Sequence, residues 1–445
     1  MAERSEVDNM QRLMFINFLT FLKDQNIDYS ILGNINNLPE KIDSDIDISF
    51  SQQIYNNIER LIQVYCSKYN YRLCNCFNHE ISSKYFLIVY LNEKTKISTF
   101  LAIDACSDYY RNNKLILTWE KLLENNQIIS KRNCDFKVCN TTVSFLYYFI
   151  KRVEKKKVSK DSFTYLKSLW DLETDAIKKE LRNIYGSAGL NQIELLFNKN
   201  VYDGINAELL NNLTNFSTNR IKIYDIYKEY LRIYNRIIKP TGLVIAFLGC
   251  DGSGKSTIIN NIYNRHLSNS IFRDKKYFHL CPEFIQKPKI ASENPHSLKT
   301  RNSFLSSIKI IFLLFKYVIS FWLLVYPKKA KSNIIFFDRY FHDILIDPIR
   351  YRHGGSLKLA TLVGKIVPKP DLFFIIDAPP DLLLLRKQEV SFIEAERQSK
   401  AYRKIASKLS NAFIIDNSAN SEIATLQIET ILLDYLAGRL KIHGS

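Results

Sequence analysis

The stretch Gly249-Cys250-Asp251-Gly252-Ser253-Gly254-Lys255-Ser256-Thr257 decides how the C-terminal half of the chain folds. It follows an apolar run at 243–247 and opens a segment with helical spacing at 256–265. Glycines at these positions let backbone N–H groups point inward around an anion, and the start of the helix adds the positive end of its dipole. The stretch therefore predicts a phosphate-binding loop that joins a strand to a helix.

The side chains of this loop predict its ligands. Lys255 is placed to reach the outer phosphates of a nucleotide, and the Ser256 hydroxyl is placed to ligate magnesium. The glycines, Asp251, Ser253 and Thr257 complete the predicted nucleotide contacts. We expect ATP and Mg²⁺ as cofactors of a phosphoryl transfer.

Further apolar runs follow at 334–337, 372–376 and 413–415. Such runs, alternating with helical segments, indicate a parallel sheet with helices on both faces, which binds ligands beyond the carboxyl ends of its strands. Asp338 and Arg339 follow the first of these runs directly. We expect Asp338 to hold magnesium and Arg339 to hold the acceptor or the transferring phosphate.

From about 243 to 437 the chain resembles the thymidylate kinase family, through the Asp-Gly-Ser-Gly-Lys-Ser-Thr loop and the motif Asp338-Arg339-Tyr340. The resemblance implies that Asp251 lies near the acceptor and that Arg339 contacts the acceptor phosphate. It also implies a lid, here 386–402, that supplies further cations. The candidates are Arg386, Lys387 and Arg397.

This sequence differs from the family's usual pattern at two places that concern the acceptor. Leu248 stands where the family commonly has Glu, and His279-Leu280-Cys281-Pro282-Glu283 replaces its Arg-Glu-Pro-Gly strand. The runs 338–352 and 386–389 resemble divergent thymidylate kinase-like proteins encoded among bacterial surface-polysaccharide genes, which implies a sugar or glycan acceptor. The contacts that this implies are His342, Asp343 and Arg352. A genuine thymidylate or other nucleoside monophosphate kinase, and an ATP-binding scaffold without turnover, are the alternatives.

A second constellation lies near the N-terminus: Gly33-Asn34, then Asp43-Ser44-Asp45-Ile46-Asp47-Ile48, then Ile103-Asp104. Asp45 and Asp47 share one face of a predicted strand, because side chains there repeat every two residues. Two such carboxylates repel each other unless a cation lies between them. With Asp104 they predict a site for divalent metal and triphosphate.

This pattern resembles the nucleotidyltransferase fold, although Asn34 stands where that family prefers Ser or Gly. The resemblance implies either an active nucleotidyltransferase, whose substrate the kinase half supplies, or a degenerate domain that binds substrate or positions the kinase. The helical segments that follow would be its customary extension.

The predicted fold class is α/β with three parts: an α+β nucleotidyltransferase-like domain at 1–115, a helical region at 116–239 and the P-loop kinase domain at 240–445. Lys239-Pro240-Thr241-Gly242 marks the last boundary as a turn before a new strand. In the first domain we expect helices at 7–25 and 53–69, and strands at 29–32, 45–50, 71–75, 85–91 and 99–104.

The chain has 445 residues, a formal charge of +17 and an apolar share of 46%. This composition excludes general disorder, and the charge favours anionic partners. Much of the charge lies in stretches such as 151–160, which we interpret as solvated helix faces, so no nucleic-acid partner is expected. The first eight residues lack the apolar core of a signal peptide, and the eight cysteines are interpreted as thiols. We expect a cytoplasmic protein.

The segment 303–326 is strongly apolar, with Lys309 and Lys316 seven residues apart. Its length permits a membrane span. However, it lies between the phosphate-binding loop and Asp338, and a single crossing would separate these two across the bilayer. We therefore expect either a core helix or a helix in a membrane interface, with peripheral contact at the inner face of the membrane.

Overall fold

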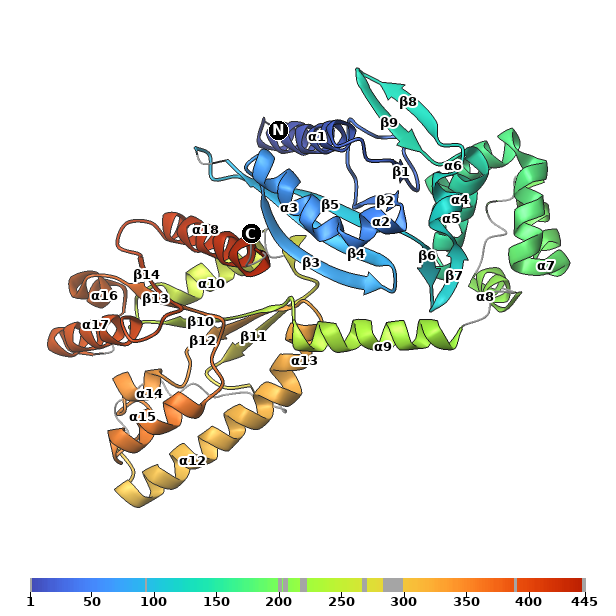
Figure 1. Cartoon of the computed structure of the whole chain (residues 1–445). Coiled ribbons are helices and arrows are strands. Elements are labelled where there is room, and N and C mark those ends of the chain that lie inside the picture. Colours follow the sequence, from blue (N-terminus) through green and yellow to red (C-terminus); the bar gives the residue numbers. More distant parts are fainter. Residues whose placement is uncertain are drawn as a thin grey trace. The chain divides into compact units, whose positions relative to one another are not determined.

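The computed structural model describes residues 2–92, 94–198, 202, 207–216, 222–265, 270–282, 299–387 and 390–441. The chain divides into two compact units, Met1–Asn235 with Leu436–Ser445, and Arg236–Tyr435. Each contains a sheet of its own (Figure 1). The division falls a few residues before the turn at 239–242 from which the last domain boundary was predicted.

The first unit is built on a mixed seven-stranded sheet in the order β3-β4-β5-β2-β1-β9-β8. Its strands are β1 (Tyr29–Ile31), β2 (Ile46–Phe50), β3 (Arg72–Glu80), β4 (Ser83–Leu91), β5 (Ser98–Cys106), β8 (Gln127–Lys131) and β9 (Cys134–Val138). A short hairpin is made by β6 (Tyr109–Arg111) and β7 (Lys114–Leu117). The five strands predicted in this region are present with shifted ends.

This sheet continues past residue 115, the predicted end of the first domain. The strand β9 pairs with β1 in parallel and with β8 in antiparallel. The sequence did not predict β8, because its residues are largely exposed and lack an apolar stripe. The region after 115 therefore contributes two strands to the first sheet before its helices begin.

Three helices, α1 (Ala2–Asp24), α2 (Gln52–Asn56) and α3 (Ile58–Lys68), share one core with this sheet. Phe18 and Tyr65 meet edge to face in that core, with ring centroids 5.1 Å apart. The single helix predicted at 53–69 is two helices, because the backbone leaves helical geometry at Asn57, where φ is −109°.

A second core in the first unit is mainly helical. Its helices are α4 (Trp119–Leu123), α5 (Thr141–Glu154), α6 (Lys160–Leu172), α7 (Thr174–Asn198) and α8 (Ala207–Phe216). Phe145, Trp170 and Phe197 pack together within it. The Asn140 side chain accepts a hydrogen bond from Val143 N and so caps α5. Helix α9 (Ile223–Ile238) leads to the first strand of the second unit.

The second unit contains a fully parallel sheet in the order β11-β12-β10-β13-β14. Its strands are β10 (Leu243–Leu248), β11 (Lys275–His279), β12 (Ile334–Asp338), β13 (Leu372–Asp377) and β14 (Ala412–Asp416). The parallel sheet and four of these strands confirm the prediction. The edge strand β11 was not predicted, because its residues Lys-Lys-Tyr-Phe-His are polar or only half-buried.

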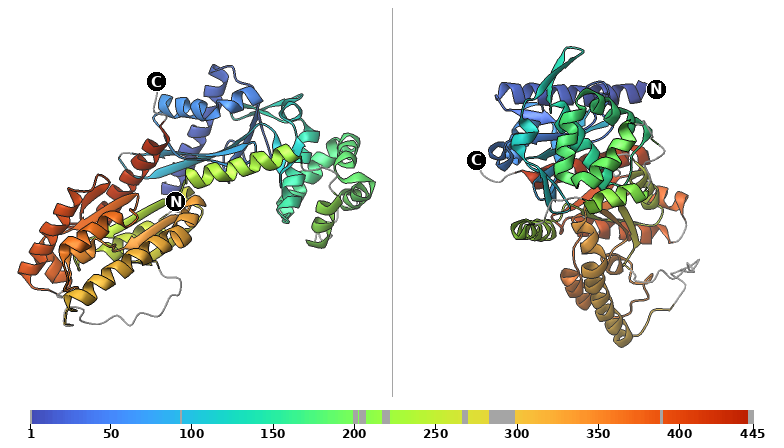
Figure 2. Two further views of the ribbon diagram at one scale, coloured as in Figure 1. Left: turned by 60° about the horizontal axis from the view of Figure 1, so that its bottom comes forward. Right: turned by 90° about the vertical axis from the view of Figure 1, so that its right-hand side faces the viewer.

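Helices cover both faces of this sheet (Figures 1 and 2). On one face Tyr263 of α10 (Lys255–Asn264) packs against Phe336, and α10 bonds to residues 421–435 of α18 (Ser421–Leu440). The other face shares its core with α12 (Ser303–Ser320), α14 (Asp343–Ile346), α15 (Leu357–Ile366), α16 (Pro380–Arg386) and α17 (Phe392–Ala406). Helix α12 continues through a π-helical turn, η3 (Phe321–Val325), into α13 (Tyr326–Ala330).

Candidate functional site

The glycine-rich loop joins β10 to α10, in the strand–loop–helix setting predicted from its sequence. Its glycines have positive φ angles of 144° at Gly249, 80° at Gly252 and 89° at Gly254. A Cβ at Gly252 would lie 2.6 Å from the carbonyl oxygen of Leu383. The loop conformation therefore requires glycine for both its backbone angles and its close packing.

Lys255 begins α10, and its ammonium group folds back over the loop. Nζ donates hydrogen bonds to the carbonyl oxygens of Gly249 at 2.8 Å and Cys250 at 2.7 Å. The residue is only 6% exposed. Burial, helped by the positive charge of Arg339, lowers the pKa of Lys255 to about 8. The cation is thus held beside the loop by carbonyl groups that anionic oxygens could replace.

Asp338 ends β12 at the same edge of the sheet as the loop, because its strand pairs in parallel with β10 and places it opposite Phe247. Its Oδ2 accepts a hydrogen bond from Tyr277 Oη at 3.0 Å. Ser256 and Thr257 are exposed in the first turn of α10. The end of β12 and the first turn of α10 thus place the Asp338 carboxylate and the hydroxyl groups of Ser256 and Thr257 at the same edge of the sheet.

Arg339 and Arg350 both donate to the carboxylate of Asp251, one to each oxygen. Arg339 has a positive φ of 73°, and its Nη1 also donates to Asp343 Oδ2 at 3.0 Å. Asp343 is fully buried and accepts a second bond from Tyr402 Oη at 2.9 Å. Asp251 therefore gathers two guanidinium groups beside the loop. Arg350 lies within the run 338–352, but the sequence did not predict it as a site residue.

The residues predicted to touch a glycan have other partners. Asp343 accepts hydrogen bonds from Arg339 and Tyr402, and burial raises its pKa while the charge of Arg339 opposes this. His342 is buried with its ring against Phe373, and burial lowers its pKa to about 4. Arg352 donates to the carbonyl oxygen of Lys299 at 3.0 Å.

The three cations of the predicted lid have different surroundings. Arg386 donates through both Nη atoms to the carbonyl oxygen of Asn417, at 3.2 and 3.1 Å. Arg397 binds Glu394 and the carbonyl oxygen of Ile346, and Lys387 is exposed at the end of α16. Residues 388–389 of the predicted lid and Glu283 of the altered acceptor strand lie outside the described residues.

Asn417 is a contact of the loop that the sequence did not point to. Its Nδ2 donates to the carbonyl oxygen of Ser253 at 2.7 Å, and its backbone N–H donates to Asp377 O at 2.8 Å. It follows β14 directly, so the end of a fourth strand supports the loop. A lone Asn after a strand has many possible roles, and only the fold places it here.

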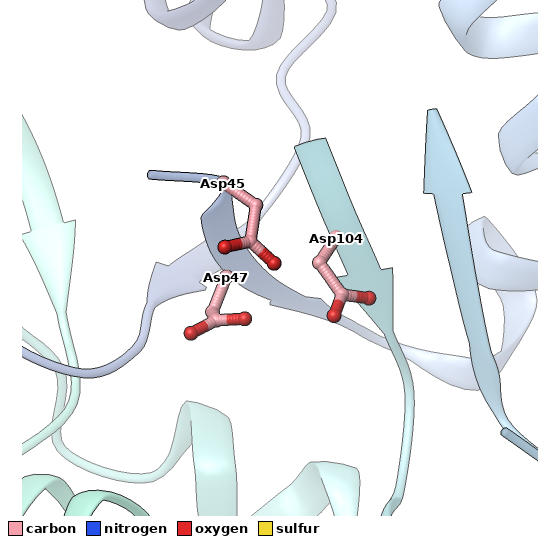
Figure 3. A group of neighbouring side chains, drawn as sticks. All are labelled: Asp45, Asp47 and Asp104. Atoms are coloured by element: carbon pink, nitrogen blue, oxygen red, sulfur yellow. The ribbon is translucent and has the colours of Figure 1, made fainter. Parts of the chain in front are cut away.

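The first unit brings together the three acids predicted from its sequence. Figure 3 shows the carboxyl groups of Asp45, Asp47 and Asp104 turned toward one another. One oxygen from each lies within 4.8 Å of the others. Asp45 precedes β2, Asp47 belongs to it, and Asp104 lies opposite Asp47 on the neighbouring strand β5. This acid cluster is the only group of its kind among the described residues.

Two basic side chains contact the acid cluster. Lys151 Nζ donates to Asp47 Oδ2, and His79 Nε2 lies 3.2 Å from Asp104 Oδ2. Burial disfavours the charged form of His79, but the hydrogen bond that His79 donates to Asp104 and the negative charge of Asp104 outweigh burial and raise the His79 pKa. Lys151 is only 8% exposed, so interpreting 151–160 as a solvated helix face was wrong at this residue. That stretch is also not one helix, because α5 ends at Glu154 and α6 begins at Lys160.

The acid cluster has oxygens without a protein partner. Asp47 Oδ1 and Asp104 Oδ1 are buried and accept no hydrogen bond. Burial raises the pKa of Asp47, Lys151 opposes this, and the neighbouring acids raise it further. Unpaired carboxylate oxygens grouped in this way are ligands that a hard divalent cation prefers. The residues present therefore fit a magnesium ion.

Two cavities open onto the acid cluster. The larger has a volume of about 430 Å³, and its lining includes Asn34, Asp45, Lys151, Arg152 and Lys155. The smaller, about 190 Å³, shares Asp45, Lys151 and Lys155 with it. Basic and acidic side chains thus face the same space, which suits an anionic ligand bound through a cation.

The turn before β2 is held close to the acids. Gly33 has a positive φ of 87°, and its carbonyl oxygen accepts a hydrogen bond from Tyr165 Oη at 2.9 Å. A Cβ there would lie 3.6 Å from Asp47 Oδ2. Helix α6, which carries Tyr165, therefore fixes the turn that borders the larger cavity.

Comparisons with known proteins concern the second unit. Residues 247–432 match the family model described as Thymidylate kinase. A thymidylate kinase of Xanthomonas campestris pv. campestris is 25% identical over 216 residues, which are 47% of this chain and 90% of the relative. One of Xanthomonas oryzae pv. oryzae is 26% identical over 224 residues, with the same coverage. The crystal structure of thymidylate kinase from Ehrlichia chaffeensis has 18% identity and a TM-score of 0.31, and covers 43% of this chain and 98% of that chain.

The C-terminal half of the chain is therefore a thymidylate kinase-like domain, and the protein is a P-loop kinase. The relatives cover this half only. The first unit, with its acid cluster, lies outside the part of the chain that these relatives match.

Proposed function

We propose that the second unit transfers the γ-phosphoryl group of ATP, with Mg²⁺, to a phosphate-bearing acceptor of the nucleotide or sugar class. One observation carries this proposal: the glycine loop with Lys255 lies beside Arg339 and Arg350, both held by the single carboxylate of Asp251. This arrangement provides one place for the donor phosphates and an adjacent pair of cations for the acceptor.

The donor side depends on the loop and the ends of β10 and β12. The loop N–H groups would bind the phosphates, and Lys255 would exchange the carbonyl oxygens of Gly249 and Cys250 for phosphate oxygens. Ser256 and Asp338 would hold magnesium, which bridges phosphate oxygens and neutralises developing charge. Asn417, supported by Arg386, keeps the loop in this shape.

The acceptor side depends on the two arginines. Guanidinium groups bind phosphate through paired N–H donors, so Arg339 and Arg350 suit an acceptor that carries a phosphate. The names of the curated relatives favour thymidylate as that acceptor. The sequence resemblance to surface-polysaccharide proteins favours a phosphorylated sugar or glycan and a role in polysaccharide biosynthesis. Both reactions would take place in the cytoplasm, where ATP is available.

An acceptor screen tests this function. The whole chain is incubated with Mg²⁺ and γ-labelled ATP together with thymidylate, other nucleoside monophosphates, sugar phosphates or unphosphorylated sugars. We expect label transfer to one phosphorylated class, with Lys255→Ala as the blank and exposed Lys408→Ala as the matched control. Transfer only to unphosphorylated sugars would contradict the acceptor assignment, and ATP binding without transfer to any acceptor would favour the scaffold alternative.

A second function, nucleotidyl transfer by the first unit, is favoured by the acid cluster. Asp45, Asp47 and Asp104 would hold the metal, which would supply charge neutralisation for a bound triphosphate. Lys151 and Lys155 would contact the phosphates from the cavity wall. The unpartnered oxygens of Asp47 and Asp104 support this proposal.

Separate variants distinguish the two functions. If the first unit is an active nucleotidyltransferase, Asp45→Ala abolishes transfer of a labelled nucleotidyl group and Lys255→Ala does not. If every activity and Mn²⁺ binding measured by electron paramagnetic resonance persist in Asp45→Ala, the metal assignment fails as well.

A further inference from the structure

Helix α12 and the turn η3 present large apolar side chains outward rather than inward. Phe312 is 64% exposed, Phe315 60% and Trp322 55%. The exposed set also includes Phe304, Leu305, Ile308, Ile311, Ile319 and Leu323. Soluble proteins rarely leave a continuous apolar surface of this kind uncovered.

Two polar groups of the same helix, on Lys309 and Ser306, point the other way. Lys309 Nζ donates to the carbonyl oxygen of Tyr351 at 2.9 Å, and Ser306 Oγ accepts from Gly354 N at 2.9 Å. Ile310 and Tyr317 lie in the core beside the parallel sheet. The helix is therefore anchored by its polar side and two core residues, and its more apolar side is the outer one.

Helix α15 packs beside α12 and extends this surface. It adds exposed Leu357, Leu362 and Ile366. Exposed lysines lie on or next to the same elements: Lys358 and Lys365 on α15, Lys369 after α15, and Lys331 after α13. The sequence has no Asp or Glu from 299 to 337 or from 348 to 370. An apolar surface with a border of one charge sign matches an anionic membrane.

We propose that this surface, formed by α12, η3 and α15, docks the protein on an anionic lipid bilayer without crossing it. The aromatic and aliphatic side chains would enter the headgroup boundary, while the bordering lysines pair with lipid phosphates. The proposal concerns where the enzyme works and is independent of which acceptor it uses.

The same segment, Ser303–Ala330, is long and apolar enough to cross a membrane by length and composition. A crossing would remove Lys309, Ile310 and Tyr317 from their contacts. It would also lead directly into β12, which pairs along its length with β10. The surface position retains all of these contacts, so we assign an interfacial and not a spanning helix.

A second copy of the chain is a weaker occupant. A twofold interface would place this patch against itself and bring lysines of one sign together. With a formal charge of +17, two chains also repel each other overall. Self-association through this face would therefore contradict the proposal.

Vesicle sedimentation of the whole chain tests the docking surface. We expect binding to vesicles of phosphatidylcholine with phosphatidylserine, little binding to phosphatidylcholine alone, and weaker binding at high salt. The double variant Phe312→Asp/Phe315→Asp should lose at least about tenfold in partitioning, because charges replace inserted side chains. Ile423→Asp, at a site 63% exposed on α18, is the matched control and should bind as the wild type does.

Two further measurements separate a loss of membrane binding from a loss of folding. Retained ATP binding by Phe312→Asp/Phe315→Asp shows that the variant is folded, and Lys358→Glu/Lys365→Glu repeats the test without changing apolar residues. Vesicle binding that neither double variant weakens would overturn the proposal. So would a dimer in ultracentrifugation that Phe312→Asp/Phe315→Asp converts to a monomer while vesicle binding of the wild type is absent.

Discussion

The loop of the second unit and the acid cluster of the first have opposite charge balances. Around the loop, Lys255, Arg339 and Arg350 are held by carbonyl oxygens or by Asp251. In the acid cluster, Lys151 and His79 contact two of the three carboxylates, and the buried Oδ1 atoms of Asp47 and Asp104 have no hydrogen-bond partner among the described residues. The first arrangement is suited to an incoming anion, whereas the second needs an incoming cation.

This difference predicts that each site can be disabled without the other. The loop should fail when its backbone shape changes, because its donors are main-chain N–H groups. The acid cluster should fail when a charge is removed, because its ligands are side chains. If a variant chosen on this basis impaired both sites equally, the predicted independence of the two sites would be refuted.

The largest effect is expected from Gly252→Ala. The new Cβ would meet the Leu383 carbonyl oxygen at 2.6 Å in a backbone with φ of 80°, so the loop must move. We expect ATP affinity to fall by about a hundredfold and the protein to lose ~1–3 kcal/mol of stability from backbone strain. Gly438→Ala, with no neighbour within 4 Å, is the control in a helix and should be neutral or slightly stabilising. Calorimetric titration with ATP measures the difference.

The next effect is expected from Asp45→Asn, which removes one exposed charge from the acid cluster. Mn²⁺ affinity should fall at least about tenfold, since ligand charge governs the binding of hard cations. Asp43→Asn, two residues earlier and exposed beside Lys41, should leave it unchanged. If kinase turnover fell with Mn²⁺ affinity in Asp45→Asn, the two sites would not be separate.

The sequence alone predicted only some of the residues in the two sites. The loop and the acids at 45 and 47 were predicted because local spacing determines them, and Asp104 was added as an acid in a second predicted strand. Lys151 was misjudged, because a lysine in a charged run is usually solvated and only the fold places α5 against Asp47. Asn417 and Arg350 reach the loop from more than 90 residues away in the chain, so local pattern carried no signal for them.

The prediction of the strands was incomplete in the same way. Buried strands such as β10 and β13 were evident as continuous apolar runs. Edge strands β8 and β11 were missed, because their residues are exposed or polar. The apolar segment 303–326 left core and membrane-interface positions open, and only the fold, in which Lys309 points inward and Phe312 is exposed, shows which side is outermost.

A smaller effect is expected from Arg350→Ala, which sharpens the assignment of the acceptor side. Arg350 contacts the side chain of Asp251, whereas Lys255 contacts the loop carbonyls, so ATP affinity should be nearly unchanged. We expect the KM for the phosphorylated acceptor to rise at least about tenfold, as one charge-assisted contact of ~1.5 kcal/mol or more is lost. Steady-state kinetics of Arg350→Ala beside the exposed control Lys408→Ala measures this.

The smallest effect is a pH dependence of ATP binding. With a pKa of about 8, Lys255 loses its charge as the pH rises past that value, while bound phosphates favour the charged form. ATP binding should therefore take up a proton near pH 8.5 and not at pH 6.5, and affinity should fall by up to about tenfold by pH 9. Calorimetry in two buffers of different ionisation enthalpy detects the proton, and Lys255→Arg should abolish the uptake.

Equilibrium titration with ATP and Mg²⁺ tests the central claim most directly. It is performed on Asp45→Asn, to remove the metal site of the first unit, and again after adding Lys255→Ala or the control Lys408→Ala. We predict one ATP per chain in Asp45→Asn and in the Lys408→Ala control, and loss of binding with Lys255→Ala. Absence of ATP binding in Asp45→Asn, or binding that Lys255→Ala leaves unchanged, would contradict the account.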